Sequence, residues 1–463
     1  LRRQRQMCIR DSSGTVNAIK IQPDGKILIH GSAISDTGSD AIIMRYNSNG
    51  SIDTGFGTSG KVNCNSGPVD GGNTMILQPD GKIAVLGIQW TQPRANVWNT
   101  QFVVERFNDN GSKDTAFGTD GRVVTIFGSG GYDMPEAITL QPDGKIVAVG
   151  FSSNTFAVAR YTANGALDTT FDGDGKLTTS LGTGSNGSAN FVTVRPDGKI
   201  LIAGYTGNIS SNVLSFAMIQ YNTNGSLDTT FDGDGKATHP FDENDDSFTI
   251  NTILPQPDGK LLVTTTGNYD STHFTIRRYN SNATPDTTFG TNGKVTTAIQ
   301  QGYNQARGLA LQPNGTIVVA GYSHTLPSTR DDFTVTRYLG NGSLDATFGN
   351  GGILTSSFDS TNDESAILLL QPDNKLIAIG TKRNRTPNNF SYKDIALARY
   401  NANGSLDTTF GTAGKVVSAF GNNINTVKNA VMLPDGKIIL MNSYYNSYVD
   451  NDYHYELIRY TTD

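Results

Sequence analysis

The 463-residue sequence contains only two cysteines, Cys8 and Cys64, too few for a disulfide framework or a zinc site. It has no run of 18 apolar residues, so no segment qualifies as a membrane-spanning helix. No long segment places apolar residues three and four positions apart, as an amphipathic helix would. The net charge of -6 argues against a nucleic-acid partner, because such proteins need a basic surface.

What the sequence has in abundance is turn-forming residues, including 52 glycines, while charged residues make up only 17% of the chain. Gly, Asn, Asp, Ser and Thr supply the positive φ angles and local side-chain-to-backbone bonds of tight turns. This composition predicts an all-β protein of short strands joined by many turns.

One turn recurs eight times, at intervals of 54 to 63 residues. It reads Pro-Asp-Gly-Lys or a close variant, and its prolines are Pro23, Pro79, Pro142, Pro196, Pro257, Pro313, Pro372 and Pro434. Pro sets φ at the first central position, and Gly takes the left-handed position that closes a bulged hairpin. Asn374 replaces Gly once, and Asn is the residue that best tolerates that conformation.

Each turn is flanked by two short apolar strands, as in "LQPDGKIVAVG" at 140–150, and a third strand such as "FAVARY" follows. A constant piece comes next, for example "YNANGSLDTTFGTAGKV" at 400–416. Counted from its aromatic residue, Asn is at +3, Asp at +7, Phe at +10 and Gly at +14 in seven copies. A fourth strand then closes a unit of about 59 residues.

A four-stranded sheet with two apolar faces cannot bury itself and must stack on its copies. Radial stacking predicts a single eight-bladed β-propeller of four-stranded antiparallel blades over residues 13–463. The alternative is seven complete blades and an incomplete one, because the eighth copy ends at "YELIRYTTD" without the constant piece. We therefore expect a leaky seam between blades one and eight.

Residues 1–12, "LRRQRQMCIRDS", are basic, out of register with the repeats and without the apolar core of a signal peptide. We interpret this segment as a truncated start or an artefact of sequence assembly. A signal peptide is not visible, and the question of secretion stays open at this point.

The pattern "LQPDGKIVVAG…RYNxNGSLDTTFGxxGKV" resembles the delta-60 repeat family of bacterial, mostly extracellular proteins, and the resemblance covers about residues 13–463. It implies a propeller fold and an extracellular or cell-surface location. The family brings no general biochemical activity that could be carried over.

The repeated polar residues have a structural interpretation. Arg precedes the aromatic residue in seven of eight copies, but Gln220 replaces it while Asp228 remains, and Arg459 persists without a downstream Asp. We therefore expect the repeated Asp to bond backbone N–H groups of its own turn rather than Arg. "FDGDGK" occurs twice, with Asp172, Asp174, Asp232 and Asp234, but no later carboxylate completes a calcium loop. Calcium remains a weak alternative to the expectation of no cofactor.

The two ends of each blade differ in variability. Turns between strands one and two, and between three and four, are nearly constant, whereas loops between strands two and three and between blades vary in length and chemistry. Diversified loops on a rigid scaffold are where binding usually resides. The candidate ligand-binding residues are Trp90, Arg94, Trp98, Asp133, Glu136, Asp245, Asp246, Asp363 and Glu364.

No catalytic constellation is visible, because the five histidines are scattered and no Gly-x-Ser-x-Gly motif occurs. The sequence favours a monomeric, non-enzymatic propeller that binds a glycan, cell-wall material or a protein. The alternative is a polysaccharide lyase or hydrolase that uses carboxylates near the central channel.

Overall fold

The computed structural model describes residues 14–35, 38–64, 70–94, 97–128, 132–182, 186–208, 213–241, 247–267, 273–299, 302–325, 330–358, 362–385, 391–420, 423–446 and 452–461. The chain divides into two compact units, Asp11–Pro240 and Phe241–Asp463, the latter together with Leu1–Arg10. We call these the first and the second unit and describe each by itself.

Both units consist of β-strands, and no helix occurs in the described ranges. The first unit contains β1 Gly14–Ile21, β2 Ile27–Ser35, β3 Gly38–Tyr46, β4 Lys61–Asn63, β5 Asp70–Leu77, β6 Ile83–Arg94, β7 Val97–Phe107, β8 Arg122–Thr125, β9 Asp133–Leu140, β10 Ile146–Ser152, β11 Thr155–Tyr161, β12 Lys176–Thr179, β13 Asn186–Val194, β14 Ile200–Asn208, β15 Val213–Tyr221 and β16 Lys236–Pro240. The second unit contains β17 Ser247–Pro255, β18 Leu261–Gly267, β19 His273–Tyr279, β20 Lys294–Ala298, β21 Asn304–Leu311, β22 Ile317–Thr325, β23 Arg330–Tyr338, β24 Ile353–Ser356, β25 Asp363–Leu370, β26 Leu376–Arg385, β27 Ser391–Tyr400, β28 Lys415–Ser418, β29 Ile424–Met432, β30 Ile438–Asn446 and β31 Asp452–Tyr460.

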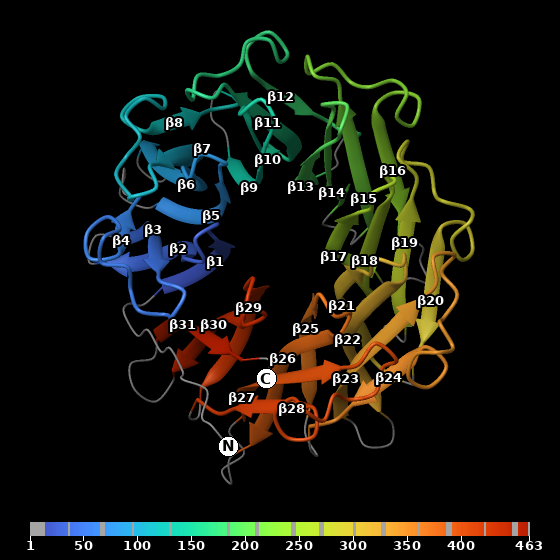
Figure 1. The fold of residues 1–463 in the computed structure, drawn as a ribbon. Coiled ribbons are helices and arrows are strands. Elements are labelled where there is room, and N and C mark those ends of the chain that lie inside the picture. Colours follow the sequence, from blue (N-terminus) through green and yellow to red (C-terminus); the bar gives the residue numbers. More distant parts are fainter. Residues whose placement is uncertain are drawn as a thin grey trace. The chain divides into compact units, whose positions relative to one another are not determined.

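Consecutive strands pair antiparallel into sheets of four, one sheet per repeat, which confirms the predicted blades. Within each unit the first strands of neighbouring blades lie side by side, and the fourth strands form the opposite edges of the sheets (Figure 1). The eighth repeat forms three strands, β29 to β31, and β29 joins β27 through one parallel bridge, Lys393 to Ile424. The described part of the chain therefore forms seven four-stranded blades and a three-stranded eighth. The predicted leaky seam stays a prediction.

The turn between the first two strands has the predicted backbone. Gly144 has φ 84° and Gly315 has φ 82°, and Asn374 adopts φ 65° where it replaces Gly. The turn glycines of seven blades have φ between 81° and 84°, so the same type of hairpin turn opens each blade.

The hydrophobic core lies between the sheets. Ile146, Val147, Ala148 and Val149 of β10 are all fully buried, so both faces of this strand are covered. Each of six clusters of buried residues combines side chains of two adjacent blades within one unit, such as Val149 of β10 with Ile202 of β14. Blades two, three, six and seven each contribute to two of these clusters, one on either face, so these blades depend on both neighbours for their core, as expected for stacked repeats.

A bulge in the first strand of the blade explains the glycine that ends the motif "KIVAVG". The pairing of β9 with β10 shifts register beside Gly150, so the carbonyl of Met134 points at its Cα. A Cβ at Gly150 would lie 2.0 Å from that oxygen, and equivalent contacts occur at Gly31, Gly204, Gly321 and Gly380. The glycine therefore accommodates the bulge.

Candidate functional site

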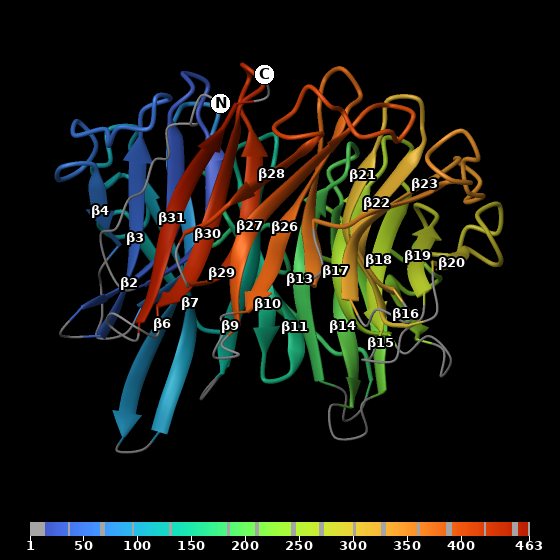
Figure 2. The same cartoon turned by 90° about the horizontal axis from the view of Figure 1, so that it is seen from below.

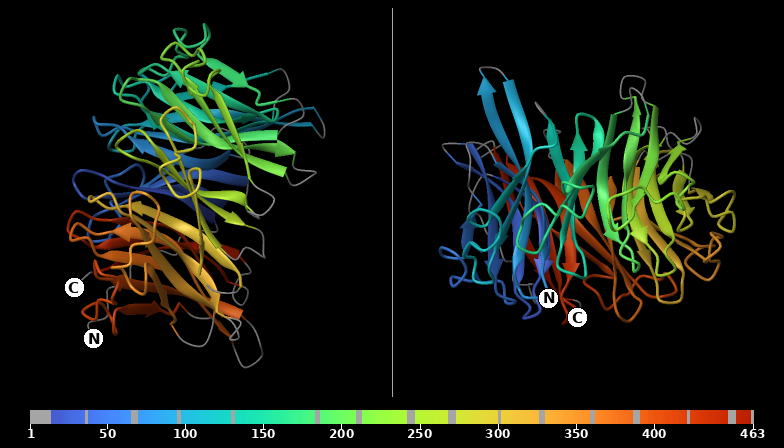
Figure 3. Two further views of the ribbon diagram at one scale, coloured as in Figure 1. Left: turned by 90° about the vertical axis from the view of Figure 1, so that its right-hand side faces the viewer. Right: turned by 90° about the horizontal axis from the view of Figure 1, so that it is seen from above.

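The two ends of a blade carry different chemistry, and the constant loops share one end. The Lys of the Pro-Asp-Gly-Lys turn reaches the Asp of the loop between strands three and four, as in Lys145 Nζ to Asp168 Oδ2 at 3.2 Å. We call this the turn end and the opposite one the loop end. At the loop end the hairpin β6–β7 projects beyond the neighbouring strands of the first unit (Figures 2 and 3).

The expectation that the repeated Asp bonds only backbone N–H groups is wrong. Asp168 Oδ1 does accept the backbone N–H of Thr170 at 3.1 Å, as predicted, but Oδ2 also pairs with Arg160 Nε at 2.7 Å. Five further blades have the same ion pair, at 2.7–2.8 Å: Arg45–Asp53, Arg106–Asp114, Arg278–Asp286, Arg337–Asp345 and Arg399–Asp407.

The electrostatics of this cluster favour the charged carboxylate. Burial alone would raise the pKa of Asp168, but the hydrogen bonds of Thr170 and Lys145 and the charge of Arg160 lower it to about 2. The pKa values of the six equivalent aspartates are also lowered.

The repeated Arg also joins adjacent blades. Arg160 donates through Nη1 to the carbonyl of Thr223 in the following blade, and its guanidinium lies 4.6 Å from the centroid of the Phe171 ring. A backbone bond from Asp172 N to Asn224 O adds a second link between the two loops. These contacts recur along each unit, so the repeated side chains of the turn end have a structural role.

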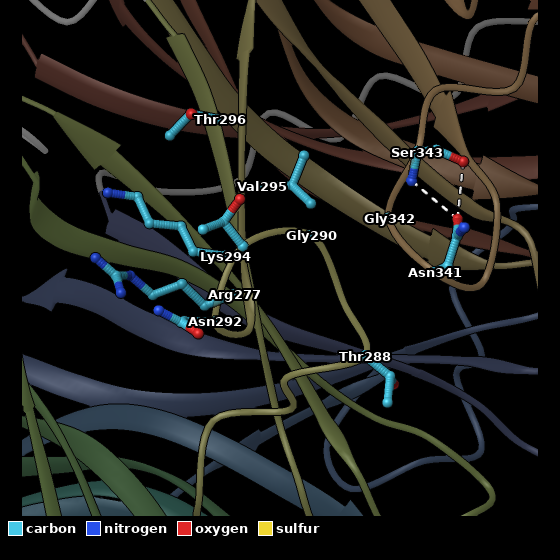
Figure 4. A pocket seen from close by; sticks show the side chains of 11 residues that line it. Arg277, Thr288, Gly290, Asn292, Lys294, Val295, Thr296, Asn341, Gly342 and Ser343 are labelled. Carbon is cyan, nitrogen blue, oxygen red and sulfur yellow. Dashed lines mark hydrogen bonds between the residues drawn. The ribbon is translucent and has the colours of Figure 1, made fainter.

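The grooves at the turn end follow from the same repeat. A groove of about 860 Å³ lies between the β19–β20 loop and the Asn341-Gly342 turn of the next blade (Figure 4). A second, of about 500 Å³, occupies the equivalent place beside Gly57 and Gly111 in the first unit. In Figure 4, Arg277 and Lys294 project to one side of the groove, away from Asn341 and Ser343. Because the same groove occurs at equivalent positions in both units, we interpret it as a by-product of blade stacking.

The candidate calcium loops show local hydrogen bonding. Asp174 Oδ1 accepts the backbone N–H of Lys176 at 3.0 Å, and Asp234 does the same for Lys236 at 2.9 Å. Within the described ranges, no three His, Cys, Asp or Glu side chains gather around a point where a metal ion would fit. The expectation of no cofactor, with calcium as its alternative, stays a prediction.

At the loop end, three aromatic side chains form a cluster that includes the predicted Trp90. The Trp90 and Tyr132 rings meet edge to face, with centroids 6.2 Å apart, and Tyr132 and Phe151 are also 6.2 Å apart. Trp90 pairs with Thr100 across β6 and β7, and Thr100 bridges to Tyr132, so the three residues form one row across two blades. Tyr132 is 49% exposed and Thr100 only 1%, which makes this cluster an accessible aromatic surface on a rigid base.

Four other predicted residues are not placed. Arg94 and Trp98 belong to β6 and β7, near the tip of the projecting hairpin, but their side chains are outside the described part. Asp245 and Asp246 lie in a segment outside the described residues.

Asp133 and Asp363 occupy equivalent positions at the start of a first strand, and both are fully buried. Asp133 Oδ2 accepts the backbone N–H of Phe127 at 3.1 Å, and Asp363 Oδ2 accepts that of Phe358 at 2.7 Å. In both blades the carboxylate thereby bridges the two ends of the loop that connects the preceding blade to the first strand.

Glu136 and Glu364 are partly exposed at the loop end. Burial raises the pKa of Glu136, and the hydrogen bond from Asn190 of the next blade, which lowers the pKa, offsets only part of that rise. Glu364 contacts Lys393 Nζ at 3.3 Å and Arg383 Nη2 at 3.5 Å, so two cations of blade seven offset its charge. The ligand-binding role of the nine predicted residues stays a prediction.

A second aromatic group, absent from the predicted residues, lies in blade six. Tyr303 precedes β21 as Tyr132 precedes β9, and Tyr322 follows Gly321 as Phe151 follows Gly150. The Tyr303 and Tyr322 rings lie 5.9 Å apart, and the Arg307 guanidinium lies 5.8 Å from the centroid of Tyr322. Aligning the repeats on the bulge glycine would have revealed both pairs.

Comparison with solved structures returned distant likenesses. A puromycin hydrolase is 14% identical (TM-score 0.42), and the chain aligns over 94% of its own length and 59% of that protein. Prolyl oligopeptidase B from Galerina marginata is 10% identical (TM-score 0.44; 94% and 56%), and the polysaccharide lyase Uly1 is 11% identical (TM-score 0.41; 96% and 90%). The chain thus spans little more than half the length of the first two. Because these TM-scores are below 0.5, none of the three informs its function.

The sequence matches no curated protein. A family model for a β-propeller domain matches seven segments: residues 22–56, 78–117, 141–171, 195–231, 256–289, 312–348 and 371–410. These segments cover more than half of the chain and confirm a repeat-propeller family, while the delta-60 name remains a prediction. The chain belongs to the family described as "Domain of unknown function (DUF5122) beta-propeller".

Proposed function

We propose that this propeller is a glycan-binding scaffold of the delta-60 type, located outside the cell or at its surface, with its ligand site at the loop end. The observation that carries the proposal is the Trp90–Tyr132–Phe151 cluster. Its rings come from two blades, and the most exposed of them, Tyr132, offers nearly half of its surface to a ligand. Flat aromatic rings beside polar strand residues such as Gln89 suit the apolar face and the hydroxyl rim of a pyranose.

The contrast between the two ends supports this location. At the turn end the repeated side chains are engaged in ion pairs and links between blades. At the loop end the same backbone carries different side chains in each blade. Variation on a constant frame is the expected arrangement for a binding surface.

The lyase or hydrolase alternative needs two carboxylates in one hollow. The three hollows whose linings are described contain one carboxylate in all, that of Glu105. Glu105 is buried at 3% exposure and out of reach of a polymer. We therefore favour binding over catalysis.

A glycan and matrix array with the purified chain tests the proposal. We expect a ligand whose binding falls about tenfold or more in Trp90→Ala and Tyr132→Ala, since central aromatic anchors contribute about 2 kcal/mol each. Leu339→Ala is the matched control, because Leu339 is an apolar residue of similar exposure, 42%, in the turn that follows Tyr338. Binding that survives both aromatic substitutions, or no glycan binding at all, would refute the proposal.

A further inference from the structure

Arg307 lies in blade six, at the bulge of β21, and differs from the residues at the same place in other blades. The equivalent Asn17, Asn73 and Asn251 each donate their amide to a backbone carbonyl of the following blade. Arg307 does not follow this pattern. Its guanidinium turns back to its own blade, toward Gln305 and Tyr322.

The contacts of Arg307 orient its charge without neutralising it. Gln305 Oε1 accepts hydrogen bonds from Nε at 2.9 Å and from Nη2 at 2.6 Å, and Gln305 itself is 6% exposed. In the turn-end arginines the same Nε meets an Asp carboxylate, as in Arg160 and Asp168. Around Arg307, no carboxylate of the described chain comes within the 4.0 Å of an ion pair. A guanidinium fixed by a neutral acceptor is prepared to receive an anion.

The charged neighbours add to this preference. Glu364 is close enough to act on Tyr322, but it contacts both Lys393 and Arg383. Asp331 is held by His324 Nδ1 at 3.0 Å and by the Asn362 amide at 2.9 Å. Both acids are therefore engaged by partners other than Arg307.

The two tyrosines beside Arg307 indicate what kind of molecule would carry the anion. Tyr322 is 6% exposed and lies beneath Arg307, whereas Tyr303 is partly exposed beside it. One ring thus supports the guanidinium, and the other offers a face next to it. A pyranose that stacks on Tyr303 would place a substituent on its ring near Arg307.

We propose that Tyr303, Tyr322 and Arg307 form a binding site for a carboxylated sugar residue, such as a uronic acid within an acidic polysaccharide. The site is separate from the Trp90 cluster, and its ligand class extends the proposed glycan function. The sugar would lie against Tyr303, and its carboxylate would accept two hydrogen bonds from Arg307.

Calorimetry with polygalacturonate tests the proposal, and its fully methyl-esterified form is the matched probe, because it has the same sugar without the charge. We expect binding of the acid form that weakens about 10- to 100-fold in Arg307→Gln, as expected for charge-assisted hydrogen bonds, and less in Arg307→Lys. Lys428→Gln is the control, because Lys428 is the cation at the same bulge of blade eight, where Ile424 and Ser443 replace the two tyrosines. Thermal unfolding of each variant verifies that the fold is intact.

Equal binding of the acid and its ester, or an Arg307→Gln variant that binds polygalacturonate as the wild type does, would overturn the site. Stronger binding of dextran sulfate than of polygalacturonate would overturn the carboxylate and assign a sulfated sugar. The Trp90 and Tyr132 variants test the proposed function and the Arg307 variants test this site. Either proposal can therefore be refuted while the other stands.

Discussion

Replacing Asp168 by Asn tests the ion-pair network that holds the turn end together. The Asp168 carboxylate contacts Arg160 Nε at 2.7 Å, Lys145 Nζ at 3.2 Å and Thr170 Oγ1 at 2.7 Å. The side chains of Arg160 and Asp168 are only 3% and 4% exposed. The substitution keeps the shape of the side chain and removes its charge, which leaves Arg160 buried without its counter-ion.

The expected loss of stability is about 3 kcal/mol. Removal of one partner from a buried ion pair typically costs about 3–5 kcal/mol. The lower end applies because the Asn oxygen still accepts the Thr170 N–H and because Lys145, 30% exposed, regains hydration. Urea unfolding followed by circular dichroism measures the change.

Asp143→Asn is the matched control in the same blade. Asp143 also contacts Lys145, at 3.4 Å, but its side chain is 53% exposed. An exposed pair contributes at most about 1 kcal/mol. If the two substitutions cost the same, burial of the Arg160–Asp168 pair does not stabilise the blade, and the reasoning fails.

The effect of Asp168→Asn should also depend on pH. The pKa of Asp168 is about 2 in the folded protein and about 3.9 in an unfolded chain, so the folded state favours the carboxylate. Its stabilisation is complete above about pH 4 and is lost as the pH falls through 2. The difference in unfolding free energy between wild type and variant should therefore shrink between pH 4 and pH 2, and a constant difference would contradict the charge-based explanation.

Two other substitutions probe the fold inside the blades. Gly150→Ala should lower stability by about 1–3 kcal/mol, because its Cβ would lie 2.0 Å from the Met134 carbonyl oxygen, whereas Gly128→Ala, with open space around it, should be nearly neutral in the same urea titration. Burial lowers the pKa of His30 to about 4, below the value of about 6.5 for an unfolded chain, so the unfolded state binds the proton more tightly. The free energy of unfolding should therefore fall by up to about 3 kcal/mol as the pH drops from 6.5 to 4. His30→Leu, which introduces the residue found at the equivalent Leu86, should abolish the part of the pH dependence in that window; an unchanged profile would show that His30 is not its source.

The features predicted correctly are those that local sequence determines. Pro, Asp and Gly within four residues define the turn, and Gly144 and Asn374 have the positive φ angles that the pattern requires. The constant spacing of the repeats gave the four-stranded blades and the shortened eighth. Stacking followed from the apolar composition of both faces of each sheet.

The Arg and the Asp of the repeats vary independently in the sequence although they pair in six blades, and the structure shows why they can. In blade four, Gln220 Nε2 donates to Asp228 at 2.6 Å, and Lys199 contacts the same oxygen at 2.8 Å. Thr230 supplies two further hydrogen bonds. Because the Asp has several donors, the loss of Arg does not remove its role.

The aromatic cluster was only partly predictable, because it depends on register between blades. Trp90 is one of only two tryptophans in the sequence, but nothing local connects it to Tyr132 in the next blade. Their proximity arises from the bridge between Thr100 and Tyr132 at the loop end. Contacts of this kind become visible in a sequence only when the repeats are aligned on a structural landmark such as the bulge glycine.

The same alignment explains why the loop end can vary without loss of the fold. In blades six and seven, a backbone hydrogen bond holds the residue that precedes the first strand. The His324 N–H donates to the carbonyl of Tyr303 at 2.8 Å, and the Arg383 N–H donates to the carbonyl of Asn362 at 2.8 Å; both donors lie near the end of the second strand. The side chains of these residues take no part in that bond, so the bond forms whichever residues occupy the two positions. Under the proposed binding function, substitution at a few positions per blade would change the ligand and keep the blade. The different chemistry of the Trp90 cluster and of the Arg307 site is what such a design would produce.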